Sequence, residues 1–143
     1  MKVKQISVFL ENKAGRLANV TRTLGNANVN IRALCIADTA DFGILRIIVD
    51  KPDQAYEVLK GAGFSATETD VLAIELPDVP GGLAAVLETM GQAQINIEYL
   101  YAFITRSAEN AVIIFRVENP EEAISLLEKS HVKILPGELV YSL

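Results

Sequence analysis

The amino-acid sequence predicts an α+β protein built from two copies of one small antiparallel module. The first observation is an internal repeat: residues 15–31 read GRLANVTRTLGNANVNI, and residues 81–97 read GGLAAVLETMGQAQINI, an ungapped offset of 66. Nine of these 17 positions are identical, whereas unrelated sequences of ordinary composition share about one. The second is that strand-type and helix-type periodicity follow one another in the same order in each half. A repeat of this kind decides the domain organisation before any other pattern.

The first strand and first helix of each copy are predicted from their periodicity. Residues 4–10 alternate, with Ile6, Val8 and Leu10 on one face, as a half-buried strand does. A turn over 12–15 follows, and its counterpart in the second copy is the proline- and glycine-rich segment 77–82. Apolar residues then recur at helical spacing, namely Leu17, Val20 and Leu24, echoed by Leu83, Val86, Leu87 and Met90. We expect Gly25 and Gly91 to end these helices in a left-handed conformation.

The rest of each copy is predicted to be strand, turn, strand, helix and strand. In the first copy, a second strand runs to about residue 37 and a third over 44–49, joined by a polar turn at 38–42. The matching turn at 105–110 is two residues longer, as a hairpin tip tolerates. The second helices open at Pro52 and Pro120, the latter capped by Asn119. The last strands cover about 64–69 and 132–135.

The resulting order, βαββαβ in each half, is the ferredoxin-like or split βαβ arrangement. Right-handed crossovers place both helices on one face of a four-stranded antiparallel sheet and leave the second strand at an edge. We therefore expect two domains, residues 1–68 and 69–143. Each has open edges, an uncovered sheet face and a marginal core, so the modules should pack as one unit, and the chain should form a homodimer or a larger closed assembly.

Composition narrows the classes of function. The net charge of −5 argues against nucleic-acid binding. Residues 1–67 carry a net +3 and residues 68–143 a net −8, through sequence drift or through unequal roles of the two halves. Cys35 is the only cysteine, so no intrachain disulfide forms. With no membrane-length apolar run and no signal-peptide pattern, we expect a cytoplasmic protein.

Catalysis is not expected. His131 is the only histidine and sits in a predicted surface turn, and no nucleophile–base pair is indicated by spacing. A single cysteine cannot supply the C-x-x-C pair of metal-carrying modules. The predicted third strand is aliphatic rather than aromatic, unlike that of RNA-recognition modules. We therefore expect no catalytic residue, metal or cofactor.

The turn before the first helix is the strongest candidate site. The backbone N–H groups of Gly15, Arg16 and Leu17 begin the helix without intrahelical partners and carry the positive end of its dipole, which suits a carboxylate. The amide of Asn12 both donates and accepts hydrogen bonds, which suits an amino acid. The alternative is that Asn12 and Asp78 only cap the helix or hold the turn.

The two copies resemble ACT domains, the small-molecule-binding regulatory modules of amino-acid metabolism. The likeness rests on Asn12-x-x-Gly15-x-Leu17 with Asn30-Ile31, and on Asp78-x-Pro80-Gly81-x-Leu83 with Asn96-Ile97. The resemblance implies a free amino acid or similar small carboxylate held between two ACT domains, one supplying the turn and the other its second strand. The implied ligand-binding residues are Asn12, Ala14, Gly15, Arg16, Leu17, Asn30, Ile31, Asp78, Pro80, Gly81, Gly82, Leu83, Asn96 and Ile97.

This chain departs from the family pattern in two respects. Leu10 and Leu76 stand where serine-sensing members have a histidine, and Ala14 stands where proline usually precedes the glycine. Two hypotheses follow: an amino-acid sensor that acts through assembly or through a protein partner, and a structural pairing module without a ligand. Under the first hypothesis we expect the first turn to be the better site, because Lys13 and Arg16 flank it while Asp78 replaces Asn12 in the second.

Overall fold

The computed structural model describes residues 1–38, 41–103 and 109–143. It divides the chain into two compact units, one formed by Lys4–Thr69 and the other by Asp70–Leu143 together with Met1–Val3. Residues 39–40 of the predicted turn at 38–42 and residues 105–108 of the predicted turn at 105–110 lie outside the described residues.

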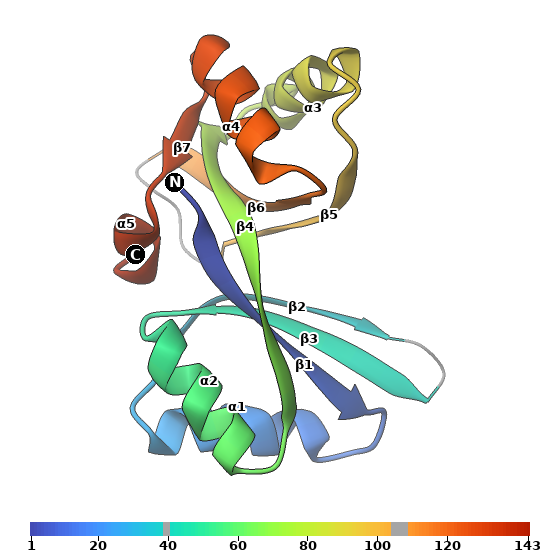
Figure 1. Ribbon diagram of the computed structural model, residues 1–143, viewed down its shortest axis with the longest axis vertical. Helices are drawn as coiled ribbons and strands as arrows, with labels where there is room; N and C mark the ends of the chain where they lie inside the picture. Colours follow the sequence, from blue (N-terminus) through green and yellow to red (C-terminus); the bar gives the residue numbers. More distant parts are fainter. Residues whose placement is uncertain (39–40, 104–108) are drawn as a thin grey trace. The chain divides into compact units, whose positions relative to one another are not determined.

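The first unit is a βαββαβ module, as predicted. Its strands follow the order β2-β3-β1-β4, so that β2 lies at an edge, and α1 and α2 lie on one face of the sheet (Figure 1). Its elements are β1 (Val3–Glu11), α1 (Arg16–Asn26), β2 (Ile31–Asp38), β3 (Phe42–Val49), α2 (Pro52–Gly61) and the first part of β4 (Ser65–Pro77). The core is aliphatic and includes Ile6, Val8, Leu24, Leu45, Ile47 and Leu59, all fully buried. The alternation of β1 produces this core, since every second side chain faces the helices.

The second unit repeats the arrangement. Its strands follow the order β5-β6-β4, with β7 paired to the other side of β4, and α3 and α4 share one face (Figure 1). Its further elements are α3 (Gly82–Gln92), β5 (Ile97–Ala102), β6 (Asn110–Val117), α4 (Pro120–Lys129), β7 (Lys133–Leu135) and α5 (Gly137–Tyr141). The five-residue helix α5 was not predicted, because it is too short to show a helical period.

The helix ends correct one prediction. Gly25 and Gly91 lie inside the last turns of α1 and α3, and the left-handed residues are Asn28 and Gln94, with φ of 59° and 60°. Each forms a Schellman motif: Asn28 N donates to Gly25 O at 3.0 Å, and Val29 N donates to Leu24 O at 2.9 Å. Asparagine tolerates the left-handed region, and the paired Val29–Leu24 contact anchors the helix end in the core.

Candidate functional site

The turn between β1 and α1 is held by backbone hydrogen bonds and by one glycine. Asn12 N donates to Asp41 O at 2.9 Å, and Lys13 N donates to Glu11 O at 2.8 Å. Gly15 is the N-cap of α1, with φ of 89°, a conformation that favours glycine. Gly81 repeats it before α3, with φ of 85°. In both copies the glycine of the motif is therefore favoured by the left-handed backbone at the N-cap. No side chain caps either helix.

The charges at the first turn are already partly paired. One oxygen of the Glu11 carboxylate lies 3.0 Å from Lys13 Nζ, and the other lies 3.4 Å from Arg16 Nη2. Hydrogen bonding to Lys13, followed by its charge and that of Arg16, lowers the pKa of Glu11. The two cations that we expected to attract a ligand carboxylate thus have an internal carboxylate beside them. In the second copy the positions matching Lys13 and Arg16 are Val79 and Gly82, so the cluster is absent there.

A hollow of about 170 Å³ lies beside the first turn. Apolar side chains from β1, α1 and β2 form part of its lining, and the turn supplies polar groups. The lining residues are Leu10, Glu11, Asn12, Lys13, Arg16, Leu17, Ile36 and Gly43. This volume is below the roughly 300 Å³ at which pockets for drug-sized ligands begin. Its size suits a small molecule or one half of a site shared with a neighbour.

Three of the predicted residues meet at this hollow, and three of its other lining residues were not predicted. Asn12, Arg16 and Leu17 line it. Glu11, Ile36 and Gly43 line it as well. Ile36 lies opposite Leu45 across the β2–β3 pair and reaches Gly43, where a Cβ atom would lie 3.4 Å from Ile36 Cδ1. Only the strand pairing brings Ile36 to the turn, so no local pattern could have identified it.

The asparagines at the starts of the second strands lie far from the turns of their own modules. Asn30 precedes β2, and its backbone N donates to Asp50 Oδ1 at 2.8 Å, at the end of β3. The turn lies beside the other end of β3, where Glu11 pairs with Phe42. Seven residue steps along a strand span about 23 Å. Asn12 and Asn30 of one module therefore do not meet.

In the second copy the asparagine before the second strand also lies far from the turn, and the turn itself is more closely packed. Asp78 follows β4, whose Pro77 pairs with Asn110, whereas Asn96 precedes β5, whose Ile97 pairs with Val117 at the far end of β6. A Cβ atom added at Gly82 would lie 2.3 Å from Pro77 O. The first copy carries Arg16 at the matching position. The two turns are therefore not interchangeable, although their glycine caps are.

The other predicted site residues lie in the two turns and at the starts of α3, β2 and β5. Ala14 and Pro80 are exposed in the turns, and Leu83 is partly buried at the start of α3. Ile31 and Ile97 are partly buried and open β2 and β5.

Neither the histidine nor the cysteine of the chain lines the hollow. His131 is exposed and left-handed at the end of α4, with φ of 59°, where its N–H closes a Schellman motif on Glu128. Burial raises the pKa of the Cys35 thiol on β2, so the reactive thiolate is disfavoured. Within residues 1–38, 41–103 and 109–143, no three or more histidine, cysteine or acidic side chains gather as metal ligands. No helix in those ranges is long and apolar enough to cross a bilayer.

The duplicated βαββαβ modules define a tandem ferredoxin-like protein. Comparison with protein families then places it: the model of the ACT domain pair, a regulatory module, matches residues 1–138, and the chain belongs to that family. A solved structure of protein BT0572 from Bacteroides thetaiotaomicron is 44% identical, with a TM-score of 0.94 over 100% of this chain and 98% of that one.

Two further solved structures share the fold at lower identity. They are regulatory subunits of aspartate kinase, one from Thermus thermophilus and one from Thermus flavus. The first is 18% identical, with a TM-score of 0.66 over 89% of this chain and 91% of that one. The second is 15% identical, with a TM-score of 0.62 over 90% and 92%. The chain has no match among curated protein sequences.

Proposed function

We propose that this ACT domain pair senses a free amino acid or a similar small carboxylate, bound where the first turn of one chain meets the second strand of an ACT domain from another copy. The observation that carries the proposal is the 170 Å³ hollow, which joins the first helical turn to the edge strand β2. It combines apolar side chains, the amide of Asn12 and the guanidinium of Arg16. Such a mixture suits a small zwitterion.

The division of the motif between two domains supports the same arrangement. Because Asn12 and Asn30 lie at opposite ends of one sheet, a ligand that touches both must lie between two copies. The open edge of β2 supplies the surface for such a copy: Leu34 and Ile36 are 38% and 52% exposed there, and Leu17 on α1 is 40% exposed. In this proposal the backbone N–H groups of Gly15 and Leu17 and the guanidinium of Arg16 hold the ligand carboxylate, since the backbone N–H of Arg16 donates to Lys13 O at 3.3 Å. Asn30 and Ile31 of the second copy close the site.

The regulatory output would pass through assembly or through a protein partner rather than through catalysis by this chain. The regulatory subunits of aspartate kinase show that a pair fold of this kind can stand as a separate regulatory subunit. Ligand binding that orders a dimer interface changes the population of the assembled state by mass action.

A second candidate is a structural pairing module without a ligand. The observation in its favour is Glu11, whose carboxylate already occupies Lys13 and Arg16 as a ligand would. In that case the hollow binds no ligand, and only the exposed edge of β2 has a function, as a surface for pairing.

A thermal-shift screen over the twenty amino acids, followed by calorimetry, separates the two. A ligand at a hundred times its Kd stabilises the folded state by about 2.7 kcal/mol. The sensor proposal expects such a shift with one or a few amino acids, and its loss in Asn12→Ala. A chain that dimerises yet responds to none of the twenty would support the structural module instead.

A further inference from the structure

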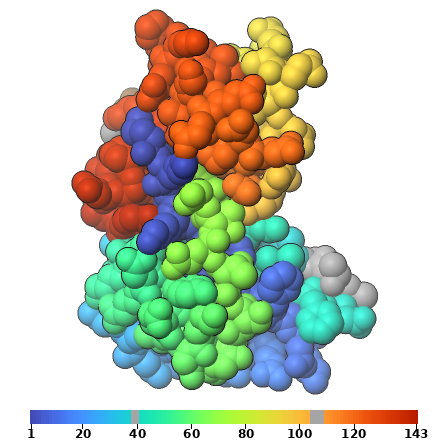
Figure 2. Space-filling model, in the orientation of Figure 1, coloured from blue at the N-terminus to red at the C-terminus, as the bar shows by residue number. Residues whose placement is uncertain are grey.

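A second surface feature lies in the second module, at the opposite end of its sheet from the Asp78 turn. Two adjoining hollows of about 400 and 300 Å³ share Ile95 and Glu122 and follow α4 along the segment after α3. Glu118 lines one end, Ile95 and Glu122 lie where the two hollows meet, and Leu126 and Lys129 line the other end. Figure 2 shows α4 in orange beside this yellow segment. We call this feature the α4 groove.

At the same place in the first module, two side chains donate hydrogen bonds to the backbone that follows α1. Lys51 Nζ donates to Asn28 O at 2.8 Å, and Gln54 Nε2 donates to Ala27 O at 3.0 Å. An ammonium group and an amide therefore satisfy the backbone carbonyls that follow α1. The ammonium group is that of Lys51, which reaches the carbonyl on an unbranched aliphatic stem.

The second module keeps the carbonyls but replaces both donors. By the repeat, Lys51 corresponds to Asn119 and Gln54 to Glu122. The backbone after α3 repeats that after α1: Ala27 has φ −88° and ψ 7°, Ala93 has φ −89° and ψ 7°, and both helices end in the same Schellman motif. The carbonyls of Ala93 and Gln94 therefore keep the orientation in which their counterparts accept hydrogen bonds.

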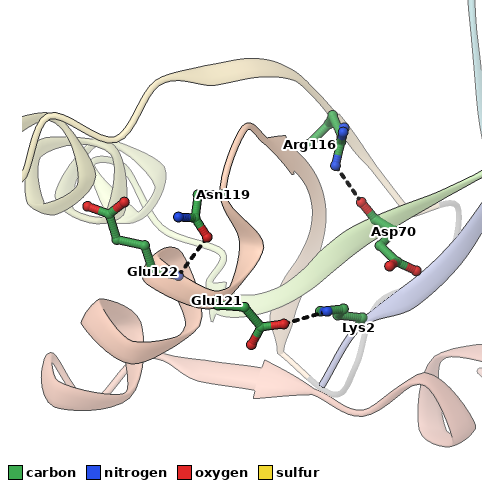
Figure 3. Close-up of polar contacts among 6 residues, drawn as sticks. All are labelled: Lys2, Asp70, Arg116, Asn119, Glu121 and Glu122. Carbon is green, nitrogen blue, oxygen red and sulfur yellow. Dashed lines mark hydrogen bonds and ion pairs between the residues drawn. The ribbon is translucent and has the colours of Figure 1, made fainter.

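Beside these carbonyls, the carboxylates of Glu118 and Glu122 only accept hydrogen bonds, whereas the side-chain amides of Gln94, Asn96 and Asn119 both donate and accept. The amide of Asn119 is engaged as a cap, because its oxygen accepts from Glu122 N at 3.3 Å (Figure 3). Figure 3 shows the Glu122 side chain pointing away from Glu121, whose carboxylate turns to Lys2 on the other side of the helix. Among the described residues, neither Glu118 nor Glu122 has a cation as partner.

We propose that the α4 groove is a second binding site, which takes a primary ammonium group on an unbranched aliphatic stem. The ammonium supplies three N–H donors to the carbonyls of Ala93 and Gln94 and to the carboxylates of Glu118 and Glu122. Glu118 and Glu122 add charge, which makes these hydrogen bonds the stronger kind. The stem lies along Ile95 and Leu126, and Lys129 receives an acidic group where the ligand has one. The ligand thus takes the place that Lys51 fills in the first module.

The ligand chemistry has two sources, a free amino compound and a lysine side chain of another protein. We test both by titrating ¹⁵N-labelled full chain with 6-aminohexanoate and with Nα-acetyl-lysine N-methylamide, while following backbone amide shifts. Shifts concentrated at Gln94, Ile95 and Glu122 are expected with at least one of them. Binding of the first alone identifies a small molecule, and binding of the second alone identifies a protein side chain. Hexanoate, which lacks the ammonium, should leave these signals unmoved.

Three variants make the test specific. Glu122→Gln removes the charge and restores the donor of the first module, so affinity should fall roughly ten- to a hundred-fold. Asn119→Lys places an internal ammonium in the groove and should abolish binding while the fold persists, as it does around Lys51. Glu121→Gln, on the other side of α4, should bind like the original chain, and so should Asn12→Ala, which removes only the turn site. No shift in the original chain with either amine, or equal binding to Glu122→Gln, would overturn the proposal.

Discussion

At the scale of single residues, Glu11 decides how the first turn behaves. Its carboxylate joins Lys13 and Arg16, and these partners lower its pKa. A carboxyl group whose pKa is lowered by folding stabilises the folded state above its usual pKa, and that contribution disappears as the pH falls through the lowered value. All three side chains are substantially exposed, so the effect on stability is small. The effect on a ligand is direct, because a ligand carboxylate and Glu11 compete for the same two cations.

Glu11→Gln should therefore tighten binding of an amino acid at the first turn. The change keeps the shape of the side chain and frees Lys13 and Arg16 for the ligand. We expect affinity measured by calorimetry to rise, with a steeper dependence on salt. Glu57→Gln, on the exposed face of α2, is the matched control and should change neither quantity. Weaker binding of the amino acid to Glu11→Gln would mean that the Glu11 carboxylate itself contacts the ammonium group of the ligand.

The two turns should contribute unequally to binding. Asn12→Ala removes an amide that lines the hollow, and the loss of one charge-assisted hydrogen bond costs about 1.5–3 kcal/mol, or roughly ten- to a hundred-fold in affinity. Asp78→Ala should cost less, since a carboxylate there repels that of the ligand. Calorimetry on both variants measures the difference. Equal losses would show equivalent sites, and no loss in either would leave both turns as structural features.

At the scale of elements, Gly82 shows that two copies of one motif need not tolerate the same residue. Gly82→Ala should destabilise the chain by about 1–3 kcal/mol, because the added methyl group would lie 2.3 Å from Pro77 O and the backbone must move. Gly91→Ala, near the end of the same helix, meets nothing within 4 Å and should instead stabilise it by about 0.5–1 kcal/mol. Denaturant unfolding of both variants measures the contrast, and two changes of the same sign would contradict it.

The order and type of the elements could be predicted from the sequence, because periodicity and proline positions are local signals. Pro52 and Pro120 begin α2 and α4, and Asn119 caps α4, as expected. The helix ends could not be read correctly, since Asn28 and Gln94 adopt the left-handed region in place of nearby glycines. Ile36 and the pairing of Glu11 with two cations depend on long-range geometry and on rotamers, which no short pattern records. The α4 groove depends on which side chains of α4 meet the backbone after α3, and only the folded chain brings these segments together.

At the scale of the whole molecule, the open β2 edge is the feature that an assembly must cover. Leu34 and Ile36 lie opposite the buried residues Ile47 and Leu45, so they continue the core face to the rim of the sheet. A strand edge that carries exposed apolar side chains is open to pairing with another chain. The proposed ligand site needs the same event, because Asn30 lies too far from the Asn12 turn of its own module to share a ligand with it.

Sedimentation of the purified chain should therefore give a dimer or a larger closed assembly rather than a 15.5 kDa monomer. Ile36→Lys should shift this equilibrium toward the monomer, because a charge buried between two strands costs several kcal/mol unless it is paired. Leu139→Lys, at a residue 42% exposed on α5, is the control and should leave the assembly unchanged. Adding the ligand of the first turn should move the equilibrium back toward the assembly, because ligand binding and strand pairing are linked and each strengthens the other. A ligand that binds the Ile36→Lys monomer with undiminished affinity would place the whole site within one copy.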